Sequence, residues 1–158
     1  MPTSPSQSTT DLLDRLQYEV ALSARRAEQT RLGGVGTARN SMDRGAYLLL
    51  HLLDSDGPMG VKALAEGMGI DASTVTRQVA PLVDSGLIKR TTDPEDRRAV
   101  VLAVSPRGHL RLEEIRTSRR QLMAIATQSW TPQEREVFTD LLGRLHETMI
   151  KRMRPGAV

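Results

Sequence analysis

Hydrogen-bonding side chains gather in one short stretch, Ser73-Thr74-Val75-Thr76-Arg77-Gln78, near the middle of the 158-residue chain. Hydroxyl groups can bind phosphate oxygens or base edges. Arginine can pair with guanine through two hydrogen bonds, and glutamine can do the same with adenine. A solvated helix face carries the same residue types, so these side chains become informative only if the surrounding elements place them together.

Apolar spacing predicts that this stretch lies on a helix. Val75, Val79 and Leu82 recur at helical intervals and make one apolar face. Asp71 or Ser73 can cap the start of the helix, and Gly86 can end it. Thr76 lies at the margin of the polar face and is expected to meet the sugar-phosphate backbone of DNA rather than a base. With the apolar face turned to the core, the side chains left facing outward are Ser73, Thr74, Arg77 and Gln78.

A β-hairpin is predicted directly after this helix. Two runs rich in Val and Ile, 86–90 and 100–104, flank a turn that contains Asp-Pro. The turn carries Arg97 and Arg98, and a narrow DNA minor groove attracts inserted arginine. Asp93 and Asp96 are expected to brace the turn and its arginines by charge-assisted hydrogen bonds. Taken alone, the turn fits a solvated loop whose ion pairs contribute little.

A short helix from about Val61 to Glu66 precedes the polar helix, so the order is helix, turn, helix, hairpin. This is a winged helix-turn-helix outline, in which the second helix fits the DNA major groove. Further helices are predicted from Thr9 or Thr10, over 41–54, from Ser105 to about Ser129, and from the Thr131–Glu134 capping box. The expected fold class is mainly α with a small β-hairpin wing.

Composition limits the alternatives. The 22 basic and 19 acidic residues give a net charge of +3, which does not by itself decide for an anionic partner. The absence of cysteine excludes disulfides and thiolate metal sites, and is compatible with a reducing cytoplasm, the expected location. No stretch approaches the roughly 20 apolar residues of a membrane span, so no membrane partner is expected. Residues 1–8 predict a disordered lead-in rather than a signal peptide.

No catalytic arrangement is visible in the sequence. His51, His109 and His146 are scattered and have no carboxylate at metal-ligand spacing. No serine stands in a nucleophile turn with histidine and aspartate partners. We therefore expect neither an enzyme nor a bound metal or cofactor.

The segment STVTRQVAPLVDSGLIKRTTDPEDRRAVVLAVSPRG resembles the signature region of the MarR family of bacterial transcriptional regulators. The matching motifs are TVTR in the polar helix, L…GLI.R at its exit, DPEDRR in the turn and L.VSPRG before the next helix. The resemblance extends more loosely from about Leu12 to Met149. It implies one domain over 9–154, with a DNA-binding lobe at 41–104 and dimerisation helices at 9–32 and 107–154.

The resemblance also implies a homodimer, and two apolar stripes near the chain ends agree with this. A small domain has little left to bury them against, so a partner chain would cover them. Two-fold symmetry would set the recognition helices about 34 Å apart on a pseudo-palindromic operator, and repression is the expected outcome. The stripes consist of Leu12, Leu13, Leu16, Val20, Val137, Leu141, Leu145 and Met149.

Members of the family often respond to small aromatic or phenolic anions bound between the dimerisation helices and the DNA-binding lobe. Here such a pocket could be lined by Tyr18, Arg26, Tyr47 and His51, although packing alone also explains any one of them. The alternative function is a winged-helix dimerisation or protein-interaction module without specific DNA binding. The arginine pair and the hydroxyl-and-arginine helix favour DNA, because a protein-binding module has no need of both.

Overall fold

The computed structural model describes residues 7–29 and 42–153, which belong to two compact units. The first unit contributes a single helix, α1 (Gln7–Gln29). It starts two residues before the expected Thr9, and the rest of the expected lead-in lies outside the described residues. Four apolar side chains of α1 that were expected to form a stripe are exposed: Leu12, Leu13, Leu16 and Val20.

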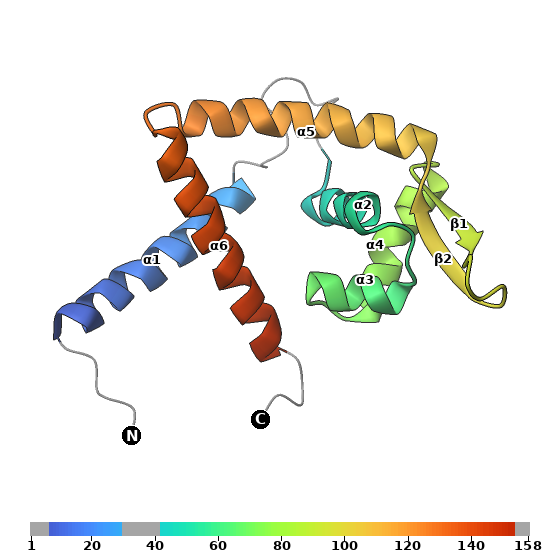
Figure 1. The fold of residues 1–158 in the computed structure, drawn as a ribbon, viewed down its shortest axis with the longest axis horizontal. Helices are drawn as coiled ribbons and strands as arrows, with labels where there is room; N and C mark the ends of the chain where they lie inside the picture. Colours follow the sequence, from blue (N-terminus) through green and yellow to red (C-terminus); the bar gives the residue numbers. More distant parts are fainter. Residues whose placement is uncertain (1–6, 30–41, 154–158) are drawn as a thin grey trace. The chain divides into compact units, whose positions relative to one another are not determined.

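The second unit confirms the expected fold class, since one antiparallel hairpin stands among helices (Figure 1). None of the helices in the described ranges is both long and apolar enough to cross a membrane. The elements in order are α2 (Arg44–Asp56), α3 (Val61–Met68), α4 (Ala72–Asp84), β1 (Ile88–Thr92), β2 (Val100–Val104), α5 (Pro106–Ala126) and α6 (Pro132–Met153).

Local side-chain chemistry sets where α6 begins. The backbone N–H of Thr131 donates to Glu134 Oε2 at 2.7 Å, and the N–H of Glu134 donates to Thr131 Oγ1 at 3.2 Å. These reciprocal bonds confirm the expected capping box, which satisfies two donors that a helix end would leave free. Hydrogen bonds from the Thr131 backbone and then its hydroxyl lower the pKa of the Glu134 carboxyl.

The Ser105-Pro106-Arg107-Gly108 motif joins the hairpin to α5. Ser105 Oγ accepts from the Gly108 N–H at 2.9 Å and donates to the Gly86 carbonyl at 2.6 Å, so one hydroxyl caps α5 and ties it to the end of α4. Gly108 is needed because a Cβ there would lie 2.1 Å from the Leu87 carbonyl oxygen. Gly86 adopts the left-handed backbone, with φ of 72°, that glycine tolerates without strain.

The hairpin, called the wing below, pairs Ile88 with Val104 and Thr92 with Val100. Its β2 strand is buried from Val101 to Val104, whereas β1 buries only Ile88. Met59 extends the sheet by exchanging two backbone hydrogen bonds with Leu102, of 2.9 and 3.1 Å.

The hydrophobic core packs α2 and α4 against the wing. Its residues include Leu49, Leu50 and Leu53 of α2 and Val75, Val79 and Leu82 of α4. These apolar faces lock α4 in place, and its opposite face is left in contact with solvent.

Candidate DNA-binding surface and ligand cavity

The start of α4 is organised around Asp71. Its Oδ1 accepts from the Thr74 N–H at 2.8 Å, which makes it the helix cap, and its Oδ2 accepts from the Thr74 hydroxyl at 2.7 Å. The Ser73 hydroxyl also donates to this carboxylate. Hydrogen bonds from Ser73 and Thr74 hold the pKa of Asp71 well below its usual range, so the group is ionised at neutral pH. Because its hydrogen is committed to Asp71, Ser73 presents only acceptor lone pairs outward.

Arg77 stands one turn further along the same exposed face. Its Nη2 donates to Thr74 Oγ1 at 3.2 Å, so Ser73, Thr74 and Arg77 form one continuous polar surface. No carboxylate lies within ion-pair distance of Arg77 among the described residues, which leaves its charge available to a partner. Thr76 donates to the Ala72 carbonyl of its own helix at 2.9 Å, and its expected contact with the DNA backbone stays a prediction.

Gln78 is placed differently from the sequence-based expectation, in which it faced outward. The side chain is half-buried and its amide lies against α2, where a Cβ on Gly45 would meet Nε2 at 2.7 Å. Its Oε1 is buried without a hydrogen-bond partner. The expectation failed because Gln78 lies at the edge of the polar face, directly before buried Val79, and Gly45 leaves room for it. Gln78 therefore packs α4 against α2.

The wing tip, residues 93–99, is shaped by its two aspartates. Asp93 Oδ1 accepts from the Glu95 N–H at 2.8 Å, and Asp96 Oδ1 accepts from the Arg98 N–H at 2.9 Å. The bracing of the turn is as expected, but the expected contacts to guanidinium groups are absent from the described part of the chain. Arg97 and Arg98 are exposed, and neither takes part in an ion pair there. Both charges are therefore free to meet phosphate.

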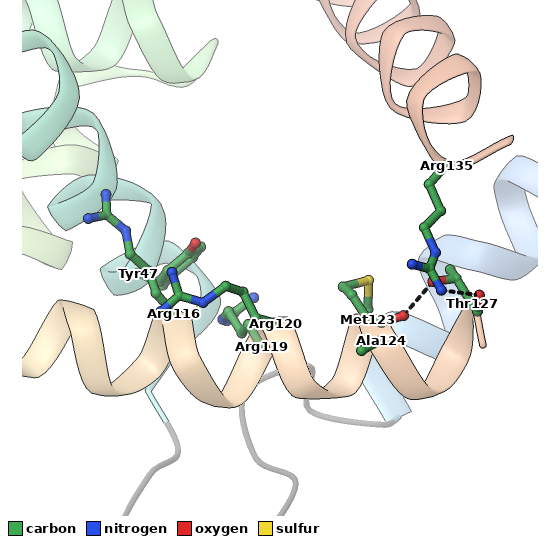
Figure 2. A pocket seen from close by; sticks show the side chains of 8 residues that line it. All are labelled: Tyr47, Arg116, Arg119, Arg120, Met123, Ala124, Thr127 and Arg135. Atoms are coloured by element: carbon green, nitrogen blue, oxygen red, sulfur yellow. Dashed lines mark hydrogen bonds between the residues drawn. The ribbon is translucent and has the colours of Figure 1, made fainter. Parts of the chain in front are cut away.

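A cavity of about 410 Å³, called the arginine cavity below, lies along α5 (Figure 2). Figure 2 shows Arg116, Arg119 and Arg120 gathered near Tyr47, while the remaining lining residues follow α5 towards the start of α6. Its eight lining residues are Tyr47, Arg116, Arg119, Arg120, Met123, Ala124, Thr127 and Arg135.

Arg119 is the central cation of this cavity. Its guanidinium carbon lies 4.0 Å from the centroid of the Tyr47 ring, a cation–π geometry. Its Nε is buried and has no hydrogen-bond partner among the described residues. Partial burial lowers the pKa of the guanidinium, against an opposing influence of Tyr47. An anion bound here would satisfy a buried donor and compensate a partly desolvated charge.

Of the four expected pocket residues, the structure brings two together. The rings of Tyr47 and His51 stack with centroids 5.9 Å apart, and Tyr47 lines the arginine cavity. Tyr18 and Arg26 lie on α1, in the other compact unit, and their expected place in a pocket stays a prediction. The arginines of α5 were missed from the sequence. Their spacing at 116, 119 and 120 was the available signal, but it also fits an ordinary solvated helix face.

No group of three or more potential metal ligands occurs in the parts of the chain that the structure describes. What the geometry does provide is a helix with a polar outer face and a wing tipped with two exposed arginines. These features define a winged helix-turn-helix DNA-binding protein.

Comparison with known proteins supplies the family. The MarR family model matches residues 43–100. The HTH-type transcriptional regulator YxaD of Bacillus subtilis is 33% identical over 138 residues, which cover 87% of this chain and 95% of YxaD. The chain belongs to the MarR family, whose members are transcription regulators and not enzymes.

Two further comparisons concern proteins with named activities. The HTH-type transcriptional repressor MdtR of Bacillus subtilis is 33% identical over 76 residues, 48% of this chain and 49% of MdtR. A solved structure of BpsR from Bordetella bronchiseptica, whose DNA binding is regulated by 6-hydroxynicotinic acid, has a TM-score of 0.63 and 23% identity. The match covers 81% of this chain and 98% of BpsR.

Proposed function

We propose that this MarR-family regulator reads an operator through the start of α4 and the tip of the wing. Ser73, Thr74 and Arg77 enter the major groove, and Arg97 or Arg98 enters the flanking minor groove. The observation that carries the proposal is that Arg77 on α4 and both wing-tip arginines are exposed and have no ion-pair partner within residues 7–29 and 42–153. Thr76, whose hydroxyl bonds the Ala72 carbonyl of its own helix, is proposed to meet the DNA backbone at the margin of this surface. Gln78 has a supporting role, since it packs against α2.

The proposed binding unit is a homodimer. The apolar stripe of α6 is exposed along most of its length, with Leu141 53% exposed, and only Leu145 is half-buried. The α1 stripe is exposed too, and such faces are costly to leave in water. The ranges 9–32 and 107–154 are thus assigned to dimerisation and 41–104 to DNA binding. A two-fold dimer calls for a pseudo-palindromic operator with half-sites about 34 Å apart.

The proposed outcome of operator binding is repression in the cytoplasm, because a dimer bound over a promoter blocks polymerase. The name of the related repressor MdtR supports this direction. The proposed effector is a small aromatic or phenolic anion held in the arginine cavity, its acidic group on Arg119 and its ring beside Tyr47. The regulation of BpsR by 6-hydroxynicotinic acid, an aromatic acid, agrees with this class.

Fluorescence anisotropy tests the DNA-binding function directly. The purified protein is titrated onto duplexes tiled from the DNA upstream of its own gene, onto scrambled duplexes and onto a random-sequence library, each over a salt series. We expect tight binding to selected sequences that weakens steeply with salt. Weak and equal binding to every duplex, the library included, would contradict the proposal and favour a protein-interaction module instead.

A further inference from the structure

A cluster of four polar side chains joins α2 to α5 beside the arginine cavity. Arg116 Nη1 lies 2.8 Å from Asp54 Oδ2, and His109 Nδ1 lies 2.9 Å from Asp54 Oδ1. The second amino group of Arg116, Nη2, lies 3.0 Å from His51 Nδ1. Because a guanidinium has only donors, His51 Nδ1 must accept this bond. We call this cluster the α2–α5 joint.

The Arg116–Asp54 pair of the joint is partly shielded from water, whereas His51 and His109 are exposed. The side chains of Arg116 and Asp54 are only 25% and 23% exposed. Charge-assisted hydrogen bonds in such surroundings are stronger than those on an open surface, and losing one partner leaves the other under-solvated. The joint therefore holds α5, which carries the cavity arginines, in a specific position against α2, which packs against α4.

Arg116 belongs to both structures, since it completes the joint and also lines the arginine cavity. Figure 2 shows its side chain close to Tyr47, at the end of the cavity where Arg119 and Arg120 also lie. Each of its terminal amino groups already meets one partner, Asp54 for Nη1 and His51 for Nη2. An anion entering the cavity competes with Asp54 for the guanidinium and places a second negative charge near Asp54.

A movement of Asp54 can be transmitted to α4 through only a few packed residues. Asp54 directly follows Leu53, which packs in the core with Val75 and Val79 of α4. The start of α2 meets α4 a second time, where Gly45 accommodates the amide of Gln78. Tightly packed interiors transmit such shifts instead of absorbing them. A change in the packing of α2 against α5 is thus expected to shift the exposed polar face of α4.

We propose that Arg116 is the positioning residue that couples the arginine cavity to DNA binding, by exchanging Asp54 for an anion in the cavity. The inference rests on the proposed function and adds its regulation. With the cavity empty, the Arg116–Asp54 bond holds α2 in the arrangement that binds DNA. With an anion present, the bond is weakened and affinity for the operator falls. Neutral ligands of the same size leave the Arg116–Asp54 bond intact and the affinity for the operator unchanged.

The chain has no cysteine, so a charge can be placed in the cavity without knowing the natural effector. Met123→Cys introduces a single thiol into the lining of the cavity. Methanethiosulfonate reagents then attach either an anionic sulfonatoethyl group or a neutral methyl group to the dimer. Operator affinity of each labelled form is compared with that of its own unlabelled form. Gln121→Cys, on α5 but outside the cavity lining, is labelled in parallel as the control for position.

The sulfonate at position 123 is expected to weaken operator binding at least about fivefold, within the usual range of allosteric coupling. The methyl label and the sulfonate at position 121 should change it by less than about twofold. The effect of the sulfonate should also disappear in an Arg116→Gln background, because the Arg116–Asp54 bond that an anion would displace is already absent there. We call this displacement the relay. If circular dichroism shows that this variant is unfolded, Asp54→Asn provides the second background.

Three results would overturn the relay: no effect of the sulfonate in the parent, an equal effect of the methyl label, or an undiminished effect in the folded Arg116→Gln or Asp54→Asn background. Failure of the proposed function looks different. In that case the unlabelled Met123→Cys protein would bind operator and scrambled duplexes alike. A protein that binds its operator selectively but ignores the anionic label contradicts the relay alone.

Discussion

Gln78 on α4 rests its side-chain amide against Gly45 at the start of α2, in the space that a Cβ would otherwise occupy. The contact fixes the recognition helix to its support, yet it leaves Gln78 Oε1 buried and without a hydrogen bond. Gln78 and Arg77, although neighbours in the chain, therefore have different environments. One side chain holds the helix in place and the other faces the solvent.

Gln78→Met replaces the buried amide with an apolar chain of similar size. Removing an unsatisfied polar atom should stabilise the protein by about 1 kcal/mol and raise its Tm by about 2–4 °C. Operator affinity should stay within about twofold, as measured by anisotropy. A large loss of affinity together with a changed preference at an A·T pair would show instead that Gln78 reads adenine.

Arg77→Ala should weaken operator binding by about 1–3 kcal/mol and relax specificity at one base pair. Binding to operators substituted one position at a time measures both effects. Arg107→Ala is the matched control, because this exposed arginine follows β2 at the end of the wing away from its tip. An unchanged affinity profile for Arg77→Ala would remove this residue from the reading surface.

Arg97→Ala and Arg98→Ala should each lower affinity for all sequences and reduce the slope of log affinity against log salt by about 1. The cause is the loss of one phosphate-neutralising charge that no acidic side chain of the described segments pairs with. Titrations at four or five salt concentrations give the slope. The variant with the larger loss on operators with a narrow, A·T-rich flank identifies the arginine in the minor groove. Unchanged slopes in both variants would contradict a role of the wing.

Leu141→Glu places a charge on the exposed apolar stripe of α6. The variant should be monomeric in light scattering, and its affinity for a two-half-site operator should fall about a hundredfold because the half-sites no longer cooperate. Thr139→Glu is the control, since residue 139 lies on the other side of the helix from Val137 and Leu141. A dimeric Leu141→Glu protein would locate the interface elsewhere.

Acid should weaken the α2–α5 joint. Partial burial acts to raise the pKa of Asp54, but hydrogen bonds and charges from Arg116 and His109 outweigh it and bring the pKa below its ordinary value of 3.8. A carboxyl whose pKa is lower in the folded state stabilises the protein above its unfolded pKa, and loses this effect as the pH falls through the folded one. The stability difference between the parent and Asp54→Asn should shrink as the pH falls below 3.8. Urea unfolding followed by circular dichroism measures it.

Most of the fold could be predicted from the sequence because its signals are local. The Thr131–Glu134 box and the Ser105–Gly108 motif act within one helical turn, so residue types and spacing predict where α5 and α6 begin. The exposed position of Arg77 follows in the same way from the periodicity of the buried residues. These features need no knowledge of which elements pack together.

The rest depends on contacts between distant segments. Gln78 turned inward because Gly45, 33 positions earlier, makes room for it, and periodicity cannot show such a gap. The arginine cavity combines side chains of α2, α5 and α6, so its walls exist only after packing. On a helical projection, Arg116 and Arg119 are indistinguishable from solvated residues, and only the structure reveals Asp54 beside one and Tyr47 beside the other.

Trp130 is the single tryptophan of the chain, and it meets Phe138 edge-on, with ring centroids 5.3 Å apart, where α5 gives way to α6. Neither ring belongs to the core shared by α2, α4 and the wing. Intrinsic fluorescence excited at the indole band therefore reports on the corner between α5 and α6, and it does not report directly on the helix-turn-helix core. The protein thus carries a built-in optical reporter for this corner, and the rest of the molecule must be followed by another signal.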